Sequence, residues 1–356
     1  MLKEWKTGRR GDRSLFGIRV ALTQLMWSCV LFLPIIFGDA PQAGAESQTK
    51  VRISQSEVGA SAVPLWVAIK QGLFKKYGVE VEPIYVRGSN IQIAGLSVGS
   101  FQFANTGGAP SLNAAGAGVN VKIVATVIRR LPFDIVVAPE IKVPADLRGK
   151  ELGVTNIGGT TWMAAMLGLE HLKMDADRDN VKLRALGNAT ILAQALETGR
   201  LHAILVDQFY SRRLEQKGFR VLANLSRSGI PFTSTGMTTL STYLEQHSNV
   251  VESVLKALLE AQAFIANPAN RIDVVKTIAE RLKSPDVSVA EESYQDAREN
   301  LEQKPYPDLD GLRNIHRLMV RLNPQVARIR VEDLIDDRIM RKLDRSGFID
   351  DLYKAR

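Results

Sequence analysis

Two patterns of apolar and polar residues, one typical of strands and one of helices, alternate along most of the chain. Short runs of β-branched and apolar residues predict strands, and apolar residues three or four positions apart predict helices between them. The predicted strands span residues 51–55, 79–86, 101–104, 121–128, 133–138, 151–155, 181–185, 201–206 and 219–222. The predicted helices span residues 64–77, 160–174, 190–198 and 208–217, with another that begins at Ser89 or Asn90. This alternation predicts an α/β fold whose sheets are mixed and mainly parallel, flanked by helices.

The last third of the chain changes to a helical pattern. From Thr238 onward apolar residues recur at helical spacing, and Asn267-Pro268 ends the first long run. Pro305 and Pro307 mark a loop, and the pattern after it is again mainly helical up to Tyr353.

The first 45 residues have the pattern of an export signal. Six basic side chains precede the apolar run Leu25–Phe37, and Ala43-Gly44-Ala45 supplies small residues at the expected cleavage site. The apolar run is shorter than the roughly 20 residues that cross a bilayer as a helix. We therefore predict a signal peptide at residues 1–45 and a periplasmic protein, with an uncleaved membrane anchor as the alternative.

Composition narrows the chemistry of the mature part. Cys29 is the only cysteine and lies in the predicted signal, so the mature chain offers no disulfide, thiolate nucleophile or thiolate metal site. The formal net charge of +8 falls to +5 without residues 1–45, a mild excess that is consistent with an anionic ligand. Charges are interspersed along the chain, so nucleic acid is not an expected partner.

The mature length of about 310 residues suits two α/β lobes rather than one core. We expect lobe 1 to comprise residues 46–130 and 233–356, including the helical C-terminal part, and lobe 2 to comprise residues 131–232. The chain would cross between the lobes near residues 129–133 and 228–235, and the ligand cleft would lie between the lobes.

Gly-rich turns follow two of the predicted strands and are the leading candidates for a binding site. The segment NIGGTT precedes a helix, so its backbone can approach a ligand closely and the helix offers free N–H groups to an oxyanion. The candidates there are Asn156, Gly158, Gly159, Thr160 and Thr161. The same reasoning applies after the third strand to Thr106, Gly107 and Gly108. A plain strand–helix turn remains the alternative for both segments.

Two further strand ends add candidates. The loop after the first strand contributes Gln55, Gly59 and Ser61, although Glu57 in that loop would repel an anion if it faced the cleft. Asp207 ends another strand, where its carboxylate would either accept a hydrogen bond from a solute or cap the next helix.

Other chemically capable residues have simpler structural interpretations. Trp162 is expected to be a core aromatic rather than a cleft wall, and Arg87, Arg129 and Arg130 surface arginines rather than anion clamps. The four histidines lack ligand spacing, and neither a G-x-S-x-G nor an H-E-x-x-H motif occurs. We therefore expect no catalytic residue, metal or cofactor.

Several segments together resemble one known family. They are PLWVAIKQGLFKKYGVEVE from Pro64, FQFANTGG from Phe101, DLRGKELGVTNIGGTT from Asp146, LETGRLHAILV from Leu196 and RIRVEDLIDDRIMRKLDRSG from Arg328. Their order and spacing, over nearly all of residues 51–353, resemble the substrate-binding proteins of ABC importers of the nitrate, sulfonate and taurine type. These have the type 2 periplasmic-binding-protein fold and are related to thiamine-pyrimidine-synthase-like domains.

The resemblance implies a function without conversion of the solute. A monomer would close its two lobes on a small, anionic solute and deliver it to a membrane permease with a separate ATPase subunit. One alternative is an enzyme on the same fold, of the pyrimidine-synthase or menaquinone-pathway kind. Pyrimidine synthases carry a cysteine-rich iron-binding segment that the mature chain lacks. The other alternative is an exported sensory binding module, which the sequence leaves open.

Overall fold

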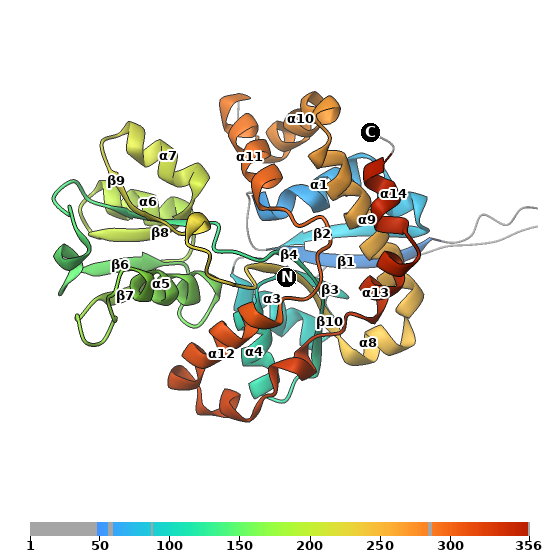
Figure 1. Ribbon diagram of the computed structural model, residues 1–356, viewed down its shortest axis with the longest axis horizontal. Helices are drawn as coiled ribbons and strands as arrows, with labels where there is room; N and C mark the ends of the chain where they lie inside the picture. The colour runs from blue at the N-terminus through green and yellow to red at the C-terminus, as the bar shows by residue number, and fades with distance from the viewer. Residues whose placement is uncertain (1–47, 56–59, 87, 284–286, 355–356) are drawn as a thin grey trace, which may run out of the picture. The chain divides into compact units, whose positions relative to one another are not determined.

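The first sheet combines four strands from the first part of the described chain with one strand, β10, that follows the second sheet (Figure 1). The computed structural model describes residues 48–55, 60–86, 88–283 and 287–354. Within these residues the first sheet has five strands in the order β2-β1-β3-β10-β4. β1 pairs in parallel with β2 and β3, and β10 runs antiparallel to β3 and β4. The strands are β1 (Thr49–Gln55), β2 (Val79–Tyr85), β3 (Phe103–Thr106), β4 (Val121–Ile128) and β10 (Thr235–Leu240).

The second sheet is formed by consecutive strands from the middle of the chain. Its order in the described residues is β7-β6-β8-β5-β9, with β6 parallel to β7 and β8, and β5 antiparallel to β8 and β9. The strands are β5 (Phe133–Val137), β6 (Glu151–Val154), β7 (Lys182–Ala185), β8 (Ala203–Asp207) and β9 (Arg220–Asn224). The chain passes between the two sheets through residues 129–132 and 228–234.

Helices connect the strands within each sheet and form the C-terminal part of the chain. The helices up to β9 are α1 (Val63–Lys70), α2 (Leu73–Lys76), α3 (Ser89–Ser97), α4 (Gly108–Gly116), α5 (Thr160–His171), α6 (Ala189–Glu197) and α7 (Gln208–Gln216). After β10 follow α8 (Ser241–Gln246), α9 (Ser248–Ala266), α10 (Arg271–Leu282), α11 (Val287–Asn300), α12 (Leu309–Leu322), α13 (Arg338–Arg345) and α14 (Phe348–Lys354). Among the described residues, none of these helices is both long and apolar enough to cross a membrane.

Side chains of adjacent residues in a strand lie on opposite faces of the sheet. In β3, Phe103 packs in the cluster with α1 and α9, whereas Ala104 packs in the cluster with α4 and α12. In β5, Ile135 points toward α5, and Val136 belongs to a third cluster with α6 and α7. This is the period of two that the strand pattern predicts.

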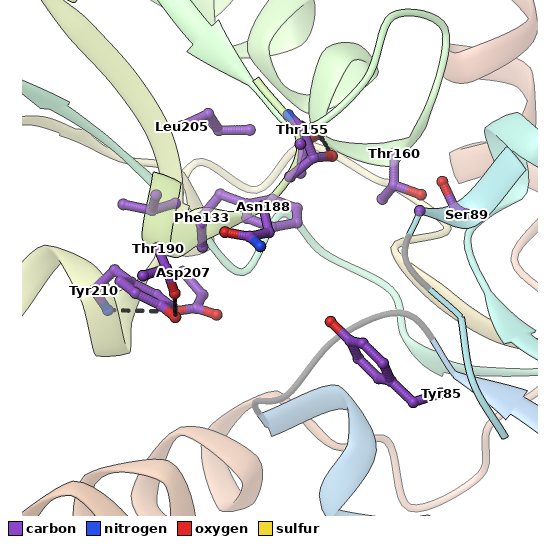
Figure 2. A pocket seen from close by; sticks show the side chains of 15 residues that line it. Tyr85, Ser89, Phe133, Thr155, Thr160, Asn188, Thr190, Leu205, Asp207 and Tyr210 are labelled. Atoms are coloured by element: carbon purple, nitrogen blue, oxygen red, sulfur yellow. Dashed lines mark hydrogen bonds between the residues drawn. The ribbon is translucent and has the colours of Figure 1, made fainter. Parts of the chain in front are cut away.

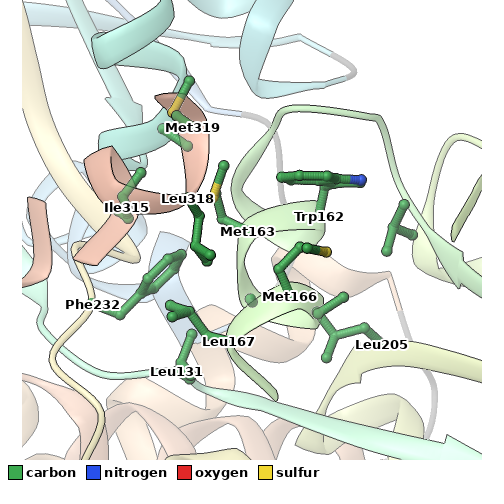
Figure 3. Packing of buried hydrophobic residues seen from close by; sticks show 14 of the residues in the cluster. Leu131, Trp162, Met163, Met166, Leu167, Leu205, Phe232, Ile315, Leu318 and Met319 are labelled. Carbon is green, nitrogen blue, oxygen red and sulfur yellow. The ribbon is translucent and has the colours of Figure 1, made fainter. Parts of the chain in front are cut away.

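One apolar cluster is shared by elements of both sheets (Figure 3). Met163, Met166 and Leu167 of α5 lie beside Leu318 and other residues of α12. Leu131 and Phe232, from the two connecting segments, belong to the same cluster and are fully buried. The connections between the sheets are therefore anchored in a packed core.

Local sequence signals explain how several of these helices begin. Pro64 occupies the first turn of α1, where its missing N–H leaves no hydrogen bond unmade. Asn188 caps α6, because its side chain accepts a hydrogen bond from the Ile191 N–H at 2.9 Å.

Three expectations from the sequence need correction. Residues 235–240 form a central strand, β10, whereas the sequence pattern predicted helix from Thr238. Gly108–Gly116 form α4, a helix that the pattern missed. The cap of α3 is Gly88, without a side-chain hydrogen bond, rather than Ser89 or Asn90. The expected sheet type is confirmed, because only β10 runs against the other four strands of the first sheet and only β5 against the other four of the second, so both sheets are mixed and mainly parallel. The predicted signal peptide, residues 1–45, lies outside the described residues.

Candidate functional site

A cavity of about 170 Å³ lies where strand ends and helix starts of both sheets meet (Figure 2). The first sheet contributes the end of β2 and the start of α3, and the second sheet contributes the ends of β6 and β8 with the turns that follow. The lining residues are Tyr85, Gly88, Ser89, Phe133, Thr155, Thr160, Thr161, Gly187, Asn188, Ala189, Thr190, Leu205, Val206, Asp207 and Tyr210. Carboxyl ends of parallel strands are the usual place for a ligand in α/β sheets.

The turn between β6 and α5 brings hydroxyls and the start of α5 to this cavity. Gly158 has φ +71°, a backbone conformation that favours glycine, and allows the sharp entry into α5. Thr161 Oγ1 accepts a hydrogen bond from the Thr155 N–H at 3.1 Å and lies 2.6 Å from Thr155 Oγ1. The N-cap residue, Gly159, has no side chain to cap α5. The first N–H groups of α5, at the positive end of its dipole, are thus available to a ligand.

The turns after β7 and β8 form the opposite part of the wall. The Asp207 carboxylate caps α7, because it accepts a hydrogen bond from the Tyr210 N–H at 3.2 Å. The same residue lines the cavity, so Asp207 has both of the positions that the sequence offered as alternatives. Thr190 Oγ1 and the Tyr210 hydroxyl are hydrogen-bonded at 2.8 Å. Burial raises the pKa of Tyr210, with the Asp207 charge acting in the same direction, so this phenol stays protonated at neutral pH.

A second, much smaller space adjoins the first at Thr160. It measures about 10 Å³, room for about one water-sized atom. The residues that line it are Gln55, Ser61, Asn105, Thr106, Gly107, Thr160, Ser234 and Thr235. Thr106 Oγ1 and Gln55 Oε1 are buried there without a hydrogen-bond partner among the described residues. Buried polar atoms are rarely left unpaired, so these two atoms point to a missing ligand or water.

The two Gly-rich turns predicted from the sequence meet at this small space. A Cβ placed on Gly107 would lie 2.3 Å from Thr160 Oγ1, which is far inside van der Waals contact. Glycine at 107 therefore allows α4 of the first sheet and α5 of the second to approach closely. A third space, of about 20 Å³, shares Ser61 with the small one and Phe133 and Asp207 with the large one.

The sequence profile of the family described as "NMT1/THI5 like" matches residues 60–271, more than half of the chain. The chain belongs to the NMT1/THI5-like family. Among individual proteins, it is 22% identical over 292 residues to the "Putative binding protein YtlA" of Bacillus subtilis (strain 168), covering 81% of this chain and 87% of that one.

Solved structures agree on the fold of this NMT1/THI5-like protein. The periplasmic nitrate-binding protein NrtA from Synechocystis PCC 6803 superposes with a TM-score of 0.71 at 15% identity, covering 86% of this chain and 91% of that chain. The alkanesulfonate-binding protein SsuA from Xanthomonas axonopodis pv. citri, bound to MOPS, superposes with a TM-score of 0.67 at 18% identity, covering 81% and 98%. The fold is that of periplasmic binding proteins.

The predicted site residues of this family member divide into two groups. The structure brings seven of them to the large or the small cavity: Gln55, Ser61, Thr106, Gly107, Thr160, Thr161 and Asp207. Four others lie just outside: Gly108 packs on Leu312, Gly158 accepts a hydrogen bond from Asn113 through its carbonyl, and Asn156 and Gly159 contact each other. Gly59 lies outside the described residues, as do Glu57 and Arg87.

Trp162, Arg129 and Arg130 do not line the three cavities described above. Trp162 is buried in the shared apolar cluster, as expected of a core aromatic. Arg129 pairs with Asp308 at 3.3 Å, and Arg130 pairs with Glu302 at 3.6 Å. No group of three metal-binding side chains occurs in the part of the chain that the structure describes.

Sequence reasoning missed the aromatic side of the large cavity. Tyr85, Phe133 and Tyr210 line it, together with the turn at Gly187 and Asn188. The Gly187-Asn188 pair after a predicted strand was a signal of the same kind as NIGGTT and was available in the sequence. None of the described residues that line the large cavity is Lys, Arg or His, so its donors are hydroxyls, amides and backbone N–H groups.

Proposed function

We propose that this protein is an extracytoplasmic solute-binding protein that holds one small solute between its two sheets. The observation that carries the proposal is the pair of cavities that share Thr160, lined from both sheets, with the Thr106 hydroxyl buried there without a hydrogen-bond partner among the described residues. The relationship to a protein named as a binding protein and the fold shared with nitrate- and sulfonate-binding proteins support it.

The solute class that we propose is small and rich in acceptor oxygens, of the sulfonate, taurine or nitrate type. Thr106 and Thr160 would donate through their hydroxyls, with the free N–H groups at the start of α5 beside them. Ser61 and Thr161 lie close enough to complete the polar wall, and Asp207 would accept from any donor that the solute carries. A full positive charge is not needed, because aligned backbone dipoles stabilise an oxyanion.

The proposed mechanism is capture by closure. Lobe 1 (residues 46–130 and 233–356) and lobe 2 (residues 131–232) would rotate about segments 129–132 and 228–234. Gly107 lies against Thr160, and in the closed state that we propose this contact would be kept, with Asn156, Gly158 and Gly159 holding the start of α5 in place. Gly59 and Gly108 would shape the adjoining turns of lobe 1. A solute that contacts both lobes favours this state because it binds the closed form more tightly.

Export and transport complete the proposal. Residues 1–45 would direct the chain to the periplasm and be removed, and the loaded monomer would dock on a permease with its ATPase subunit. The solute would leave unchanged, so we propose binding without catalysis. Incubation with a bound solute should yield no product.

Thr160→Val tests the site directly. It removes the one hydroxyl shared by the two cavities while keeping the shape of the side chain. We expect the melting temperature without solute to change little. The increase in melting temperature that a bound solute causes should largely disappear, since one or two lost hydrogen bonds weaken binding about tenfold or more.

Thr160→Ser is the matched control, because it retains the hydroxyl and should retain the solute-dependent shift. Equal shifts in wild type, Thr160→Val and Thr160→Ser would show that this turn has only a structural role.

A further inference from the structure

One side of the large cavity is lined by aromatic residues. This lining suits a solute that has apolar surface as well as polar groups. Tyr85 stands at the end of β2 with 52% of its surface exposed, while Phe133 and Tyr210 face the same space from the second sheet. Leu205 and Val206 add apolar surface to the wall. An exposed tyrosine at the edge of a cavity offers a ring face that a ligand can cover.

The two tyrosines are held differently. The Tyr210 hydroxyl is hydrogen-bonded to Thr190, and its ring meets Phe209 edge to face with centroids 5.0 Å apart, so Tyr210 is fixed. The Tyr85 hydroxyl makes no hydrogen bond to another described residue. In Figure 2 the Tyr85 side chain extends into the open space opposite Asp207 and Asn188. Tyr210 is thus held in its wall by two contacts, whereas the exposed Tyr85 ring leaves a face open to a ligand.

The size of the cavity suits a single ring. Its volume is about 170 Å³, and a cavity of about 150 Å³ in another protein admits benzene. The adjoining space at Thr106 and Thr160, of about 10 Å³, has room only for one oxygen-sized atom. The site thus combines a ring-sized compartment with aromatic walls and a polar pocket for part of a head group.

We infer that the solute is an aromatic acid: a ring that packs between Tyr85 and the Phe133–Tyr210 wall, joined to a compact oxyanion whose oxygen reaches Thr106 and Thr160. This inference rests on the proposed function and narrows it. Aromatic ring pairs attract each other beyond the effect of buried area, by an amount that corresponds to about a 2- to 10-fold gain in affinity.

The test compares ligands that differ only in aromaticity. Benzenesulfonate and cyclohexanesulfonate have the same head group and similar size, and benzoate with cyclohexanecarboxylate repeats the comparison for a carboxylate. Ethanesulfonate and nitrate serve as probes without a ring. Titration calorimetry with the full chain should give tighter binding of the aromatic member, by several-fold in at least one pair, and weaker binding of the two ringless probes.

Two variants of Tyr85 connect that preference to the proposed wall. Tyr85→Leu should reduce the aromatic preference to near parity, whereas Tyr85→Phe should keep it, because the ring and not the hydroxyl provides the contact. The side chain is half exposed, so both variants should fold, which circular dichroism and melting temperature verify.

Separate outcomes overturn the inference and the function. Equal affinities within both pairs, a preference for the ringless probes, or an aromatic preference unchanged in Tyr85→Leu would overturn the ring assignment and leave solute binding intact. No detectable binding of any of the six compounds would contradict the proposed function itself.

Discussion

Asp134 is a buried carboxyl whose protonation should affect stability. It is 3% exposed on β5, and one carboxylate oxygen accepts from Ser211 while the other has no partner among the described residues. Burial raises the pKa of Asp134 to about 6, with Glu215 adding to the shift and the Ser211 hydrogen bond and nearby arginines opposing it. The ionised form is therefore disfavoured in the folded state.

We predict that Asp134→Asn is more stable than wild type, and that this difference in the free energy of unfolding depends on pH. The folded-state pKa lies above the unfolded value, so the folded wild type binds the extra proton and loses stability as pH rises from about 4 to 6. The variant cannot ionise and should be more stable above pH 6, by roughly 1–3 kcal/mol, with the difference fading below pH 4. Urea unfolding at several pH values measures this.

Asp179→Asn is the control, because its effect on stability at neutral pH should have the opposite sign. Arg178, the Asp175 N–H and Arg148 hold the pKa of Asp179 well below its usual range. Its stabilising effect is present above the unfolded pKa and is lost as pH falls, so this variant should be less stable at pH 7 and approach wild type in acid. A stability difference for Asp134→Asn that is the same at pH 4 and pH 7 would contradict this account of the buried carboxyl.

At the scale of single residues, the sequence predicts those binding-site residues that lie at strand ends or in the turns after them. Thr106 and Asp207 could be selected because they lie at strand ends, and Thr160 because it opens the helix after a Gly-rich turn. Tyr85 and Tyr210 could not be selected in this way, because an aromatic residue near a strand end is equally suited to a core. Only the tertiary arrangement places both on one cavity.

At the scale of elements, α5 and α12 are held together by apolar packing, with ion pairs in a secondary role. Leu318 of α12 is 1% exposed, whereas the neighbouring Arg317 lies half exposed and pairs with Glu170 of α5 at 2.7 Å. Exposed ion pairs contribute little, because water and salt screen them. Removing a buried leucine also leaves a cavity.

This contrast gives a paired prediction on adjacent residues. Leu318→Ala should lower the free energy of unfolding by about 2–4 kcal/mol. Arg317→Met should lower it by less than about 1 kcal/mol, and that loss should shrink further in high salt. Chemical denaturation measures both, and a larger effect of Arg317→Met would mean that the ion pair holds this contact.

The elements that the sequence pattern missed share a physical cause. β10 reads Thr-Gly-Met-Thr-Thr-Leu and has no apolar alternation of its own, since it is buried on both faces between β3 and β4. α4 is built from small residues, Gly-Ala-Pro-Ser-Leu-Asn-Ala-Ala-Gly, and packs closely against α12. Both elements are stabilised by contacts with residues far away in the sequence, and a local pattern of apolar residues does not reveal such contacts. Strands such as β4, with strong local signals, were predicted with the correct ends.

At the scale of the whole molecule, the account depends on two sheets that present their strand ends to one small volume. The core shared by α5, α12, Leu131 and Phe232 joins the sheets on one side. On another side a polar contact joins them, in which Arg212 of α7 pairs with Asp296 of α11 at 2.7 Å. Between these contacts lie the Thr106 hydroxyl, which has no hydrogen-bond partner among the described residues, and the start of α5, which no side chain caps.

Calorimetric titration of the full chain with a panel of small sulfonates, carboxylates and nitrate, one compound at a time, tests this arrangement most directly. At least one compound should bind saturably with a stoichiometry of one and raise the melting temperature in proportion to its affinity. Absence of heat and of any melting shift across the whole panel would contradict the claim that these sheets enclose such a solute.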